Sequence, residues 1–313
     1  MKYVLTVTLN PSLDRMIALK EFRVGKEFDI SQETLSAGGK GLNVSRALKH
    51  LGTPTYATGL LAGVTGQIIR KLLDTEGIKD NFSEIDGSTR VNLMIYDQKT
   101  HKTTRLLGLG PKVSASQIRI FKAKYQSLLK RSSLVVISGR NAHDAPDNFC
   151  AQLITLAHEF AIPAIVDTHS KPLEFAIEAK PFLIKPNLKE LEELLGYELK
   201  TIEKMVQAID QLHARGARMV LLSMANEGAI LSNGQDMWRA IPPDVTVHND
   251  VGSGDTMVAG FVYGYFKGWP LKNILSFSVA AGTINAMGSI PGAIDRRQVD
   301  QILKRVKVHK VIR

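Results

Sequence analysis

The segment "NDVGSGDTMVAGFVYGYF", residues 249–266, places a Gly-Ser-Gly turn and an aspartate directly before an apolar run. The apolar residues after Asp255 recur at spacings of three and four, which predicts a helix with a buried face. A glycine-rich turn leading into a helix favours anions, because free N–H groups and the positive end of the helix dipole point outward. In phosphate loops of the GxxxxGK[ST] kind a lysine follows the glycines, whereas here an aspartate does. The segment therefore predicts an anion site that contains a carboxylate.

Strand-like apolar runs alternate with amphipathic helical segments along most of the chain. The predicted strands are 3–9, 133–139, 162–168, 182–187, 219–224 and 229–234. The predicted helices are 40–52, 115–131, 147–160, 189–196 and 202–216. This alternation predicts one α/β domain over 1–313 with a doubly wound, mostly parallel sheet and helices on both faces. In such a sheet, ligands bind at the carboxyl ends of the strands.

Two regions break this alternation. Residues 16–37 and 88–110 read as antiparallel strands joined by polar turns. We expect them to form a small β-sheet, a lid over the site that spans about 12–36 and 88–110.

Composition limits the classes of partner. The net charge of +10 invites a nucleic-acid interpretation, but no aromatic residues interleave with the charges of the basic tail, 295–313. The tail reads as a solvated terminal helix, and a basic surface also suits small polyanionic substrates. No apolar run is long enough to span a membrane, and Cys150 is the only cysteine. We therefore expect a cytoplasmic protein with neither a nucleic-acid nor a membrane partner.

Four further segments could carry chemistry, and each also has an ordinary structural explanation. In "AGGKGLNVSRALKHLG" (37–52), two glycines and a lysine precede a helix, which suits a ligand or close packing. "TLNPSLDR" (8–15) displays polar residues after a strand, or simply turns. "IKPNLKELEELLG" (184–196) has Asn and Glu three apart, which could hold waters on Mg²⁺ or complement a helix dipole. "LLSMANEGAILSNG" (221–234) could support a nucleotide or be a plain hairpin.

Asp255 likewise has two readings. It could cap its helix, or it could take a proton from a hydroxyl that attacks a phosphoryl group while glycine N–H groups stabilise the departing phosphates.

Taken together, these segments resemble the ribokinase-like carbohydrate kinases, the PfkB family. "AGGKGLNVSRAL" looks like its first signature, "DVGSGDTMVAGFV" like its second, and "KPNLKE" like its metal-linked Asn-x-x-Glu segment. The motifs occur in family order, and the resemblance extends over essentially the whole chain. "TLNPSLDR" is similar to the start of the phosphosugar branch, which includes 1-phosphofructokinases and tagatose-6-phosphate kinases.

The resemblance implies ATP and Mg²⁺ as cofactors and assigns the catalytic residues. Asp255 would be the base, and the anion hole would consist of Gly252, Ser253 and Gly254. Mg²⁺ would be held through water by Asn187 and Glu190. The nucleotide site would include Lys185, Asn187, Ser223, Gly228, Val251, Gly252 and Gly254.

The resemblance also assigns the acceptor site and the substrate. Sugar hydroxyls would be bound by Asp14, Gly38, Gly39 and Asn43, and the phosphate of the substrate by Lys40, Arg90 and Arg105. The expected reaction converts fructose 1-phosphate to fructose 1,6-bisphosphate. The alternatives are a tagatose-6-phosphate kinase and a non-catalytic metabolite sensor. In this branch the lid commonly pairs with the lid of another subunit, which makes a homodimer possible.

Two segments depart from the family pattern. "SGRNAHDAP" (138–146) stands where Ser-Gly-Ser-Leu-Pro is usual, so Arg140 adds a phosphate contact or the site accepts another sugar. "TRLLGLGP" (104–111) lacks a usual Glu-Ile-Asn run and sets Arg105 among apolar residues.

Overall fold

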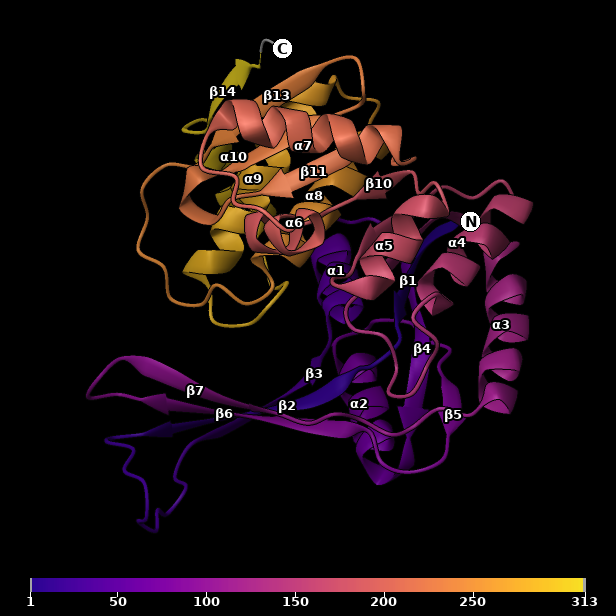
Figure 1. Cartoon of the computed structure of the whole chain (residues 1–313). Coiled ribbons are helices and arrows are strands. Elements are labelled where there is room, and N and C mark those ends of the chain that lie inside the picture. Colours follow the sequence, from indigo (N-terminus) through magenta and orange to yellow (C-terminus); the bar gives the residue numbers. More distant parts are fainter. Residues whose placement is uncertain (1, 312–313) are drawn as a thin grey trace.

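The computed structural model describes residues 2–311 and contains two β-sheets (Figure 1). The larger sheet has ten strands in the order β14-β13-β12-β11-β10-β9-β8-β1-β4-β5. The strands from β5 to β11 pair in parallel, whereas β12, β13 and β14 extend the sheet in antiparallel fashion. Their bounds are β1 Tyr3–Thr8, β4 Thr55–Ala62, β5 Ser83–Ile85, β8 Ser132–Ser138, β9 Ala164–Asp167, β10 Leu183–Ile184, β11 Val220–Ser223, β12 Ala229–Ser232, β13 Met237–Ile241 and β14 Lys307–Lys310. The predicted mostly parallel sheet is confirmed.

Helices cover both faces of this sheet, so its central strands are apolar on consecutive residues. In β8, Leu134 and Val136 belong to the core on one face, and Val135 and Ile137 to the core on the other. The first face is covered by α1 (Lys40–His50), α8 (Ser253–Phe266), α9 (Leu271–Met287) and α10 (Arg296–Leu303). The second is covered by α3 (Ala115–Leu129), α4 (Phe149–Glu159), α5 (Lys171–Glu178), α6 (Leu188–Leu195) and α7 (Ile202–Ala214). Helix α2 (Gly63–Thr75) packs against α1 and β4 in a third cluster.

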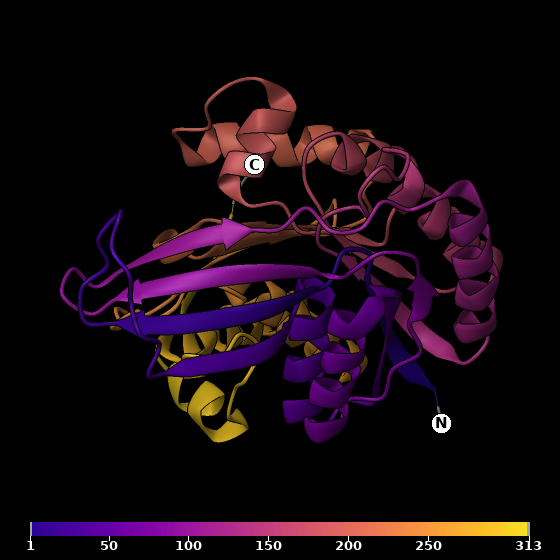
Figure 2. The same cartoon turned by 90° about the horizontal axis from the view of Figure 1, so that it is seen from below.

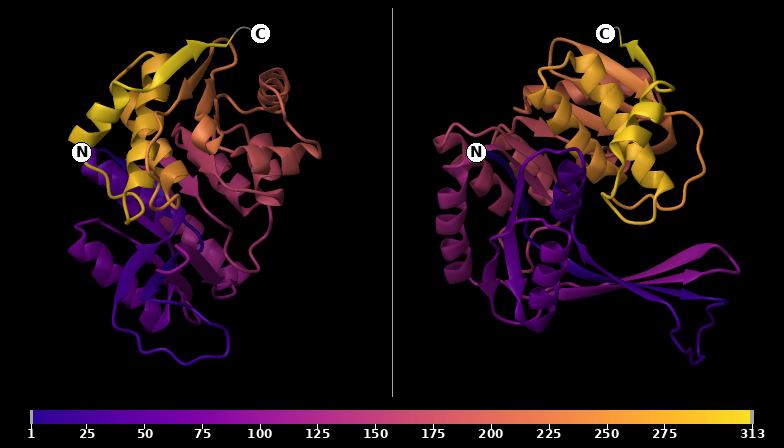
Figure 3. Two further views of the ribbon diagram at one scale, coloured as in Figure 1. Left: turned by 90° about the vertical axis from the view of Figure 1, so that its left-hand side faces the viewer. Right: turned by 180° about the vertical axis from the view of Figure 1, so that it is seen from behind.

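The smaller sheet is separate and has the strand order β3-β2-β6-β7. Its strands are β2 (Ser12–Leu19), β3 (Glu33–Gly38), β6 (Arg90–Asp97) and β7 (Lys102–Leu107). Figures 1, 2 and 3 show it extending away from the body of the molecule, below the half that carries α8 and α9. We call this four-stranded sheet the lid.

Strand register gives the lid two different faces, because successive side chains in a strand point to opposite sides. Asp14 pairs with Asn92, and Met94 with Arg105, so these residues share one face. The opposite face carries Leu93 and its partner Leu106. The polar face is turned toward the body of the molecule, where it lines a large cavity.

The basic tail corrects one expectation. Instead of a solvated helix over 295–313, the chain forms α10 and then β14, which pairs with β13. Val299 and Ile302 are buried, since the apolar side of α10 packs against α9. Within residues 2–311, none of the helices has the length and apolar character needed to cross a membrane.

Candidate active site

A cavity of about 790 Å³ lies between the lid and the carboxyl ends of the central strands. This size is typical of small-molecule sites. Of the residues predicted to form the site, all but Gly38 line it; these are Asp14, Gly39, Lys40, Asn43, Arg90, Arg105, Lys185, Asn187, Glu190, Ser223, Gly228, Val251, Gly252, Ser253, Gly254 and Asp255. The fold therefore brings together motifs that are far apart in the chain.

Asp255 lies in the first turn of α8, beside the glycine turn. The helix N-cap is Gly252, whose φ of 84° is in the left-handed region that favours glycine. In the described chain no side chain caps this end, so the backbone N–H groups of Gly254 and Asp255 are available to a ligand. The Asp255 carboxylate instead accepts a hydrogen bond from Asn43 Nδ2 at 2.7 Å. It is thus not a helix cap, and it faces the cavity with only 4% of its surface exposed.

Asn285 holds the glycine turn in place from the interior of α9. Its Nδ2 donates to the Val251 carbonyl at 2.8 Å and to Ser253 Oγ at 3.1 Å. Its Oδ1 accepts from Thr256 Oγ1 at 3.1 Å and from the Gly292 N–H at 2.7 Å. One buried amide therefore fixes both the turn and the start of α8.

Two lysines and a second aspartate surround Asp255. Asp167, at the end of β9, is buried and accepts from Lys40 Nζ at 3.0 Å. Lys185 Nζ lies 3.4 Å from the other Asp167 oxygen, and Lys40 Nζ lies 3.9 Å from Glu190. A Cβ on Gly254 would lie 3.0 Å from Lys185 Nζ, so glycine lets this lysine approach the start of α8.

This network separates the pKa values of the two aspartates. Burial and repulsion from Asp167 raise the pKa of Asp255 to about 6, partly offset by Lys40 and the Asn43 hydrogen bond. Burial also acts to raise the pKa of Asp167, but Lys185 and Lys40 outweigh it and the pKa is lowered. Burial would lower the pKa of Lys40, yet Asp167, Asp255 and Glu190 raise it. Two carboxylates whose pKa values diverge have different roles, and Asp255 is the one suited to accept a proton.

Asn187 and Glu190 form a capping box at the start of α6. Asn187 Oδ1 accepts from the Glu190 N–H at 2.8 Å, and Glu190 Oε2 accepts from the Asn187 N–H at 2.9 Å. Glu190 Oε1 remains directed toward Lys40 and the cavity. These few oxygens suit an ion that keeps most of its water, as Mg²⁺ does. Residues 2–311 contain no cluster of three or more His, Cys, Asp or Glu residues that would bind a metal directly.

On the lid side, Asp14 is held by its neighbours. Ser12 Oγ and Asn92 Nδ2 donate to Asp14 Oδ1 at 2.7 and 2.8 Å. Burial raises its pKa, and these hydrogen bonds offset part of that effect. Gly38 does not line the cavity, but a Cβ there would lie 2.1 Å from Asp14 Oδ2, so Gly38 makes room for the carboxylate. Gly39, with φ of 129°, is the N-cap of α1.

The predicted phosphate-binding cations differ in their partners. Arg90 donates to the Asn10 carbonyl at 3.0 Å and to the Gly108 carbonyl at 3.3 Å. Arg105 lies 3.1 Å from Asp250, in the segment just before the glycine turn. Lys40 is engaged by Asp167, as described. Register explains how Arg105 reaches the cavity from an apolar run, because Leu106 points to the opposite face of the lid.

Two of the predicted nucleotide-binding residues, Ser223 and Gly228, flank the turn between β11 and β12. Ser223 ends β11 and forms a bridge with Asn187. Gly228 has φ of 88°, and a Cβ there would lie 1.9 Å from the Ala240 carbonyl oxygen. Glycine is thus required at this position by the close approach of β13, and the β11–β12 turn that contains Gly228 lines the cavity.

Sequence reasoning missed several residues of this site. Asp167 is the last residue of the buried strand β9, and a carboxylate at the end of an apolar strand is a signal that could have identified it. Thr8 ends β1 and lines the cavity, and its buried Oγ1 has no hydrogen-bond partner within residues 2–311. Asn92 and Asn285 carry no local signal, because each lies inside an otherwise regular strand or helix.

Comparisons with known proteins agree with this architecture. Residues 7–291 match the pfkB family carbohydrate kinase. The chain is 34% identical to the 1-phosphofructokinase of Bacillus subtilis over 308 residues, which covers 98% of this chain and 100% of the relative. It is 33% identical to a tagatose-6-phosphate kinase of Staphylococcus epidermidis over 311 residues, with the same two coverages. The solved structure of a possible 1-phosphofructokinase from Thermotoga maritima superposes with a TM-score of 0.90 at 30% identity, covering 99% of this chain and 100% of that one. The chain therefore belongs to the pfkB family of carbohydrate kinases.

Proposed function

We propose that this protein is an ATP-dependent kinase that phosphorylates a hydroxyl group of a sugar phosphate, with Asp255 as the base. The observation that carries the proposal is the buried Asp255, whose pKa is raised to about 6, beside the uncapped N-terminus of α8 in a cavity of substrate size. A carboxylate with that pKa is ionised at neutral pH and can still hold a proton transiently.

The reaction uses residues on both sides of Asp255. The sugar hydroxyl, positioned near Asp14 and Asn43, gives its proton to Asp255 as its oxygen bonds to the γ-phosphorus. The bond from that phosphorus to the β-phosphate oxygen breaks, and ADP leaves. The N–H groups of Gly254 and Asp255, with Lys185, stabilise the negative charge on the transferring group.

We further propose that Mg²⁺ accompanies the nucleotide and is held through water by Asn187 and Glu190. When bound, the ion neutralises phosphate charge. The capping box leaves Glu190 Oε1 for this contact while fixing the side chain in place. Asn187 and Glu190 therefore suit an ion that they would contact through its bound water molecules.

Fructose 1-phosphate is the leading substrate, and tagatose 6-phosphate is the alternative. The first is suggested by the similar 1-phosphofructokinase and the second by the similar tagatose-6-phosphate kinase. The cavity supports a phosphorylated acceptor, because Arg90 and Arg105 line it from the lid, in addition to Lys40 and Lys185. Cations in addition to those that serve ATP are what a second phosphate requires.

ADP release with Mg-ATP tests this function. The panel contains fructose 1-phosphate, tagatose 6-phosphate, fructose 6-phosphate, fructose and ribose, and Asp255→Asn is the catalytic control. A strong response to fructose 1-phosphate that this variant abolishes supports the leading assignment. A response to another sugar phosphate alone retains the mechanism and changes the substrate. Binding of ATP without turnover of any sugar would favour the sensor alternative.

We infer that the lid pairs with a second copy of the chain. Its outer face exposes Leu35, Val91 and Leu106, which are 41%, 43% and 56% exposed. Apolar residues exposed side by side on a sheet commonly mark an interface. Leu106→Asp should convert a dimer to a monomer in sedimentation experiments, whereas Val64→Asp, on exposed α2, should not. A monomeric parent protein would contradict the inference.

A further inference from the structure

Among residues 2–311, Arg140 is a cation of the cavity whose side chain has no hydrogen-bond or ion-pair partner. It follows β8 and Gly139, it is exposed, and it lines the cavity. Within residues 2–311 its side chain takes part in no hydrogen bond or ion pair that the structure resolves. The other cations of the cavity are engaged: Lys40 and Lys185 by Asp167, Arg105 by Asp250, and Arg90 by backbone carbonyls. Arg140 is therefore an exposed positive charge of the cavity that has no ion-pair partner among residues 2–311.

The loop that carries Arg140 is fixed at both ends. Asn10 Nδ2 donates to the Asn141 carbonyl at 3.3 Å, and the Asn10 carbonyl accepts from Arg90 at 3.0 Å. On the other side, Thr168 Oγ1 donates to the Gly139 carbonyl at 3.0 Å. Asn10 thus connects the Arg140 loop and Arg90 directly, which places both arginines at the same end of the cavity.

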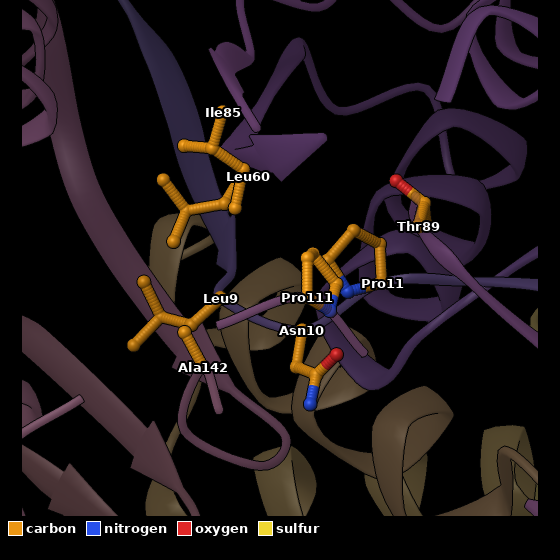
Figure 4. Close-up of a pocket in the computed structure, with 8 residues that line it drawn as sticks. All are labelled: Leu9, Asn10, Pro11, Leu60, Ile85, Thr89, Pro111 and Ala142. Carbon is orange, nitrogen blue, oxygen red and sulfur yellow. The ribbon is translucent and has the colours of Figure 1, made fainter. Parts of the chain in front are cut away.

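Packing beneath this loop is close. Figure 4 shows the small cavity under the Asn10 turn, where Ala142 of the Arg140 loop lies near Leu9. Its volume is about 10 Å³, room for no more than about one water molecule. The backbone that carries Arg140 is therefore held in place by close packing.

Electrostatics agrees with this placement. Burial lowers the pKa of Arg90; Asp14 acts to raise it, and the nearby charge of Arg140 lowers it further. Two guanidinium groups held near each other repel, and Asp14 offsets only part of this effect at Arg90. An anion bound between them would relieve that repulsion, and guanidinium groups suit phosphate because they can bind two of its oxygens at once.

We propose that Arg140, together with Arg90, binds the phosphate group that the sugar substrate already carries, and so selects phosphorylated over free sugars. This inference rests on the proposed sugar-phosphate kinase activity. The transferred phosphoryl group has its own partners in Lys185 and the start of α8. The Asn10 connection instead places Arg140 beside Arg90, which reaches the cavity from the lid.

Steady-state kinetics of Arg140→Ala tests the proposal. The matched control is Arg119→Ala, which removes an exposed arginine of α3 outside the cavity. Arg140→Ala should raise KM for the sugar phosphate roughly 10- to 100-fold, the effect of losing charged hydrogen bonds, and leave KM for ATP unchanged. The kcat/KM for fructose should stay as in the parent. Arg140→Lys should restore part of the loss, and all three variants should unfold at the same urea concentration.

Each other outcome is decisive. A raised KM for ATP would assign Arg140 to the nucleotide and overturn the proposal. Equal losses with fructose and its phosphate would show an effect through the loop alone, which also overturns it. A parent protein active on sugar phosphates with Arg140→Ala matching Arg119→Ala would refute this inference and leave the proposed function standing. A parent protein inactive on every sugar phosphate would refute both.

Discussion

Replacing Asp255 by Asn should strongly reduce turnover and yet stabilise the folded protein. The structure gives the magnitude: burial and Asp167 raise the pKa of Asp255 from its usual 3.8 to about 6. The difference is about two pH units, each equivalent to about 1.4 kcal/mol. At pH 8, keeping this carboxylate ionised in the fold therefore costs about 3 kcal/mol. Asn has no charge to desolvate, and its Oδ1 can still accept the hydrogen bond of Asn43.

The extra stability of Asp255→Asn over the parent should increase as the pH rises. The folded state binds the Asp255 proton more tightly than the unfolded chain does. Its contribution to stability is therefore fully present below about pH 4 and is lost as the pH rises through about 6. The Asn variant has no such titration. Its advantage in the free energy of unfolding should be about 3 kcal/mol at pH 8 and should fall to about 1 kcal/mol at pH 4.5.

Urea unfolding of the parent and Asp255→Asn at these two pH values measures the difference. Asp250→Asn is the matched control, because Asp250 lies in the same segment but is solvent-exposed; it should show no such pH dependence. ADP release should fall about 10²- to 10⁴-fold in Asp255→Asn. If Asp255→Asn is less stable than the parent at pH 8, or is stabilised equally at both pH values, the raised pKa assigned to Asp255 is refuted.

Three further outcomes are expected. The kcat/KM of the parent should decrease below about pH 6 with a slope of one as Asp255 becomes protonated, and a flat profile down to pH 5 would contradict its role as the base. Gly38→Ala should raise KM for the sugar at least about tenfold without changing KM for ATP, since the new Cβ collides with Asp14; unchanged sugar kinetics would show that Asp14 does not contact the sugar. Asn285→Ala removes four hydrogen bonds around the glycine turn and should lower the free energy of unfolding by about 2–4 kcal/mol in urea titrations, whereas a loss below about 1 kcal/mol would mean that water replaces the amide.

Sequence patterns predicted the features that depend on residues close together in the chain. The glycine turn and the helix of Asp255 could be read from residues 249–266 because helical spacing and glycine content act over short range. The same holds for the predicted strand 133–139, which is buried on both faces in the structure as β8, Ser132–Ser138. The separate sheet was also visible, as a break in the α/β alternation.

Long-range contacts could not be predicted in this way. Asn285 lies in an apolar helix, and its partners near Val251 are 34 residues away. Asp14 and Gly38 are adjacent only because β2 pairs with β3 in one particular register. The position of Arg105 depends on the same kind of information, since a shift of one residue would exchange the two faces of the lid.

The aspartate at the anion site is explained by where the lysines come from. In a phosphate loop that ends in GK[ST], the cation belongs to the loop, and a carboxylate there would oppose it. Here Lys40 begins α1 and Lys185 follows β10, so the positive charges reach the site from other elements. Asp167 neutralises both lysines in part and, by repulsion, raises the pKa of Asp255. Because the cations are supplied from elsewhere, the turn itself can position the carboxylate that we propose as the base beside N–H groups that are available to a phosphate.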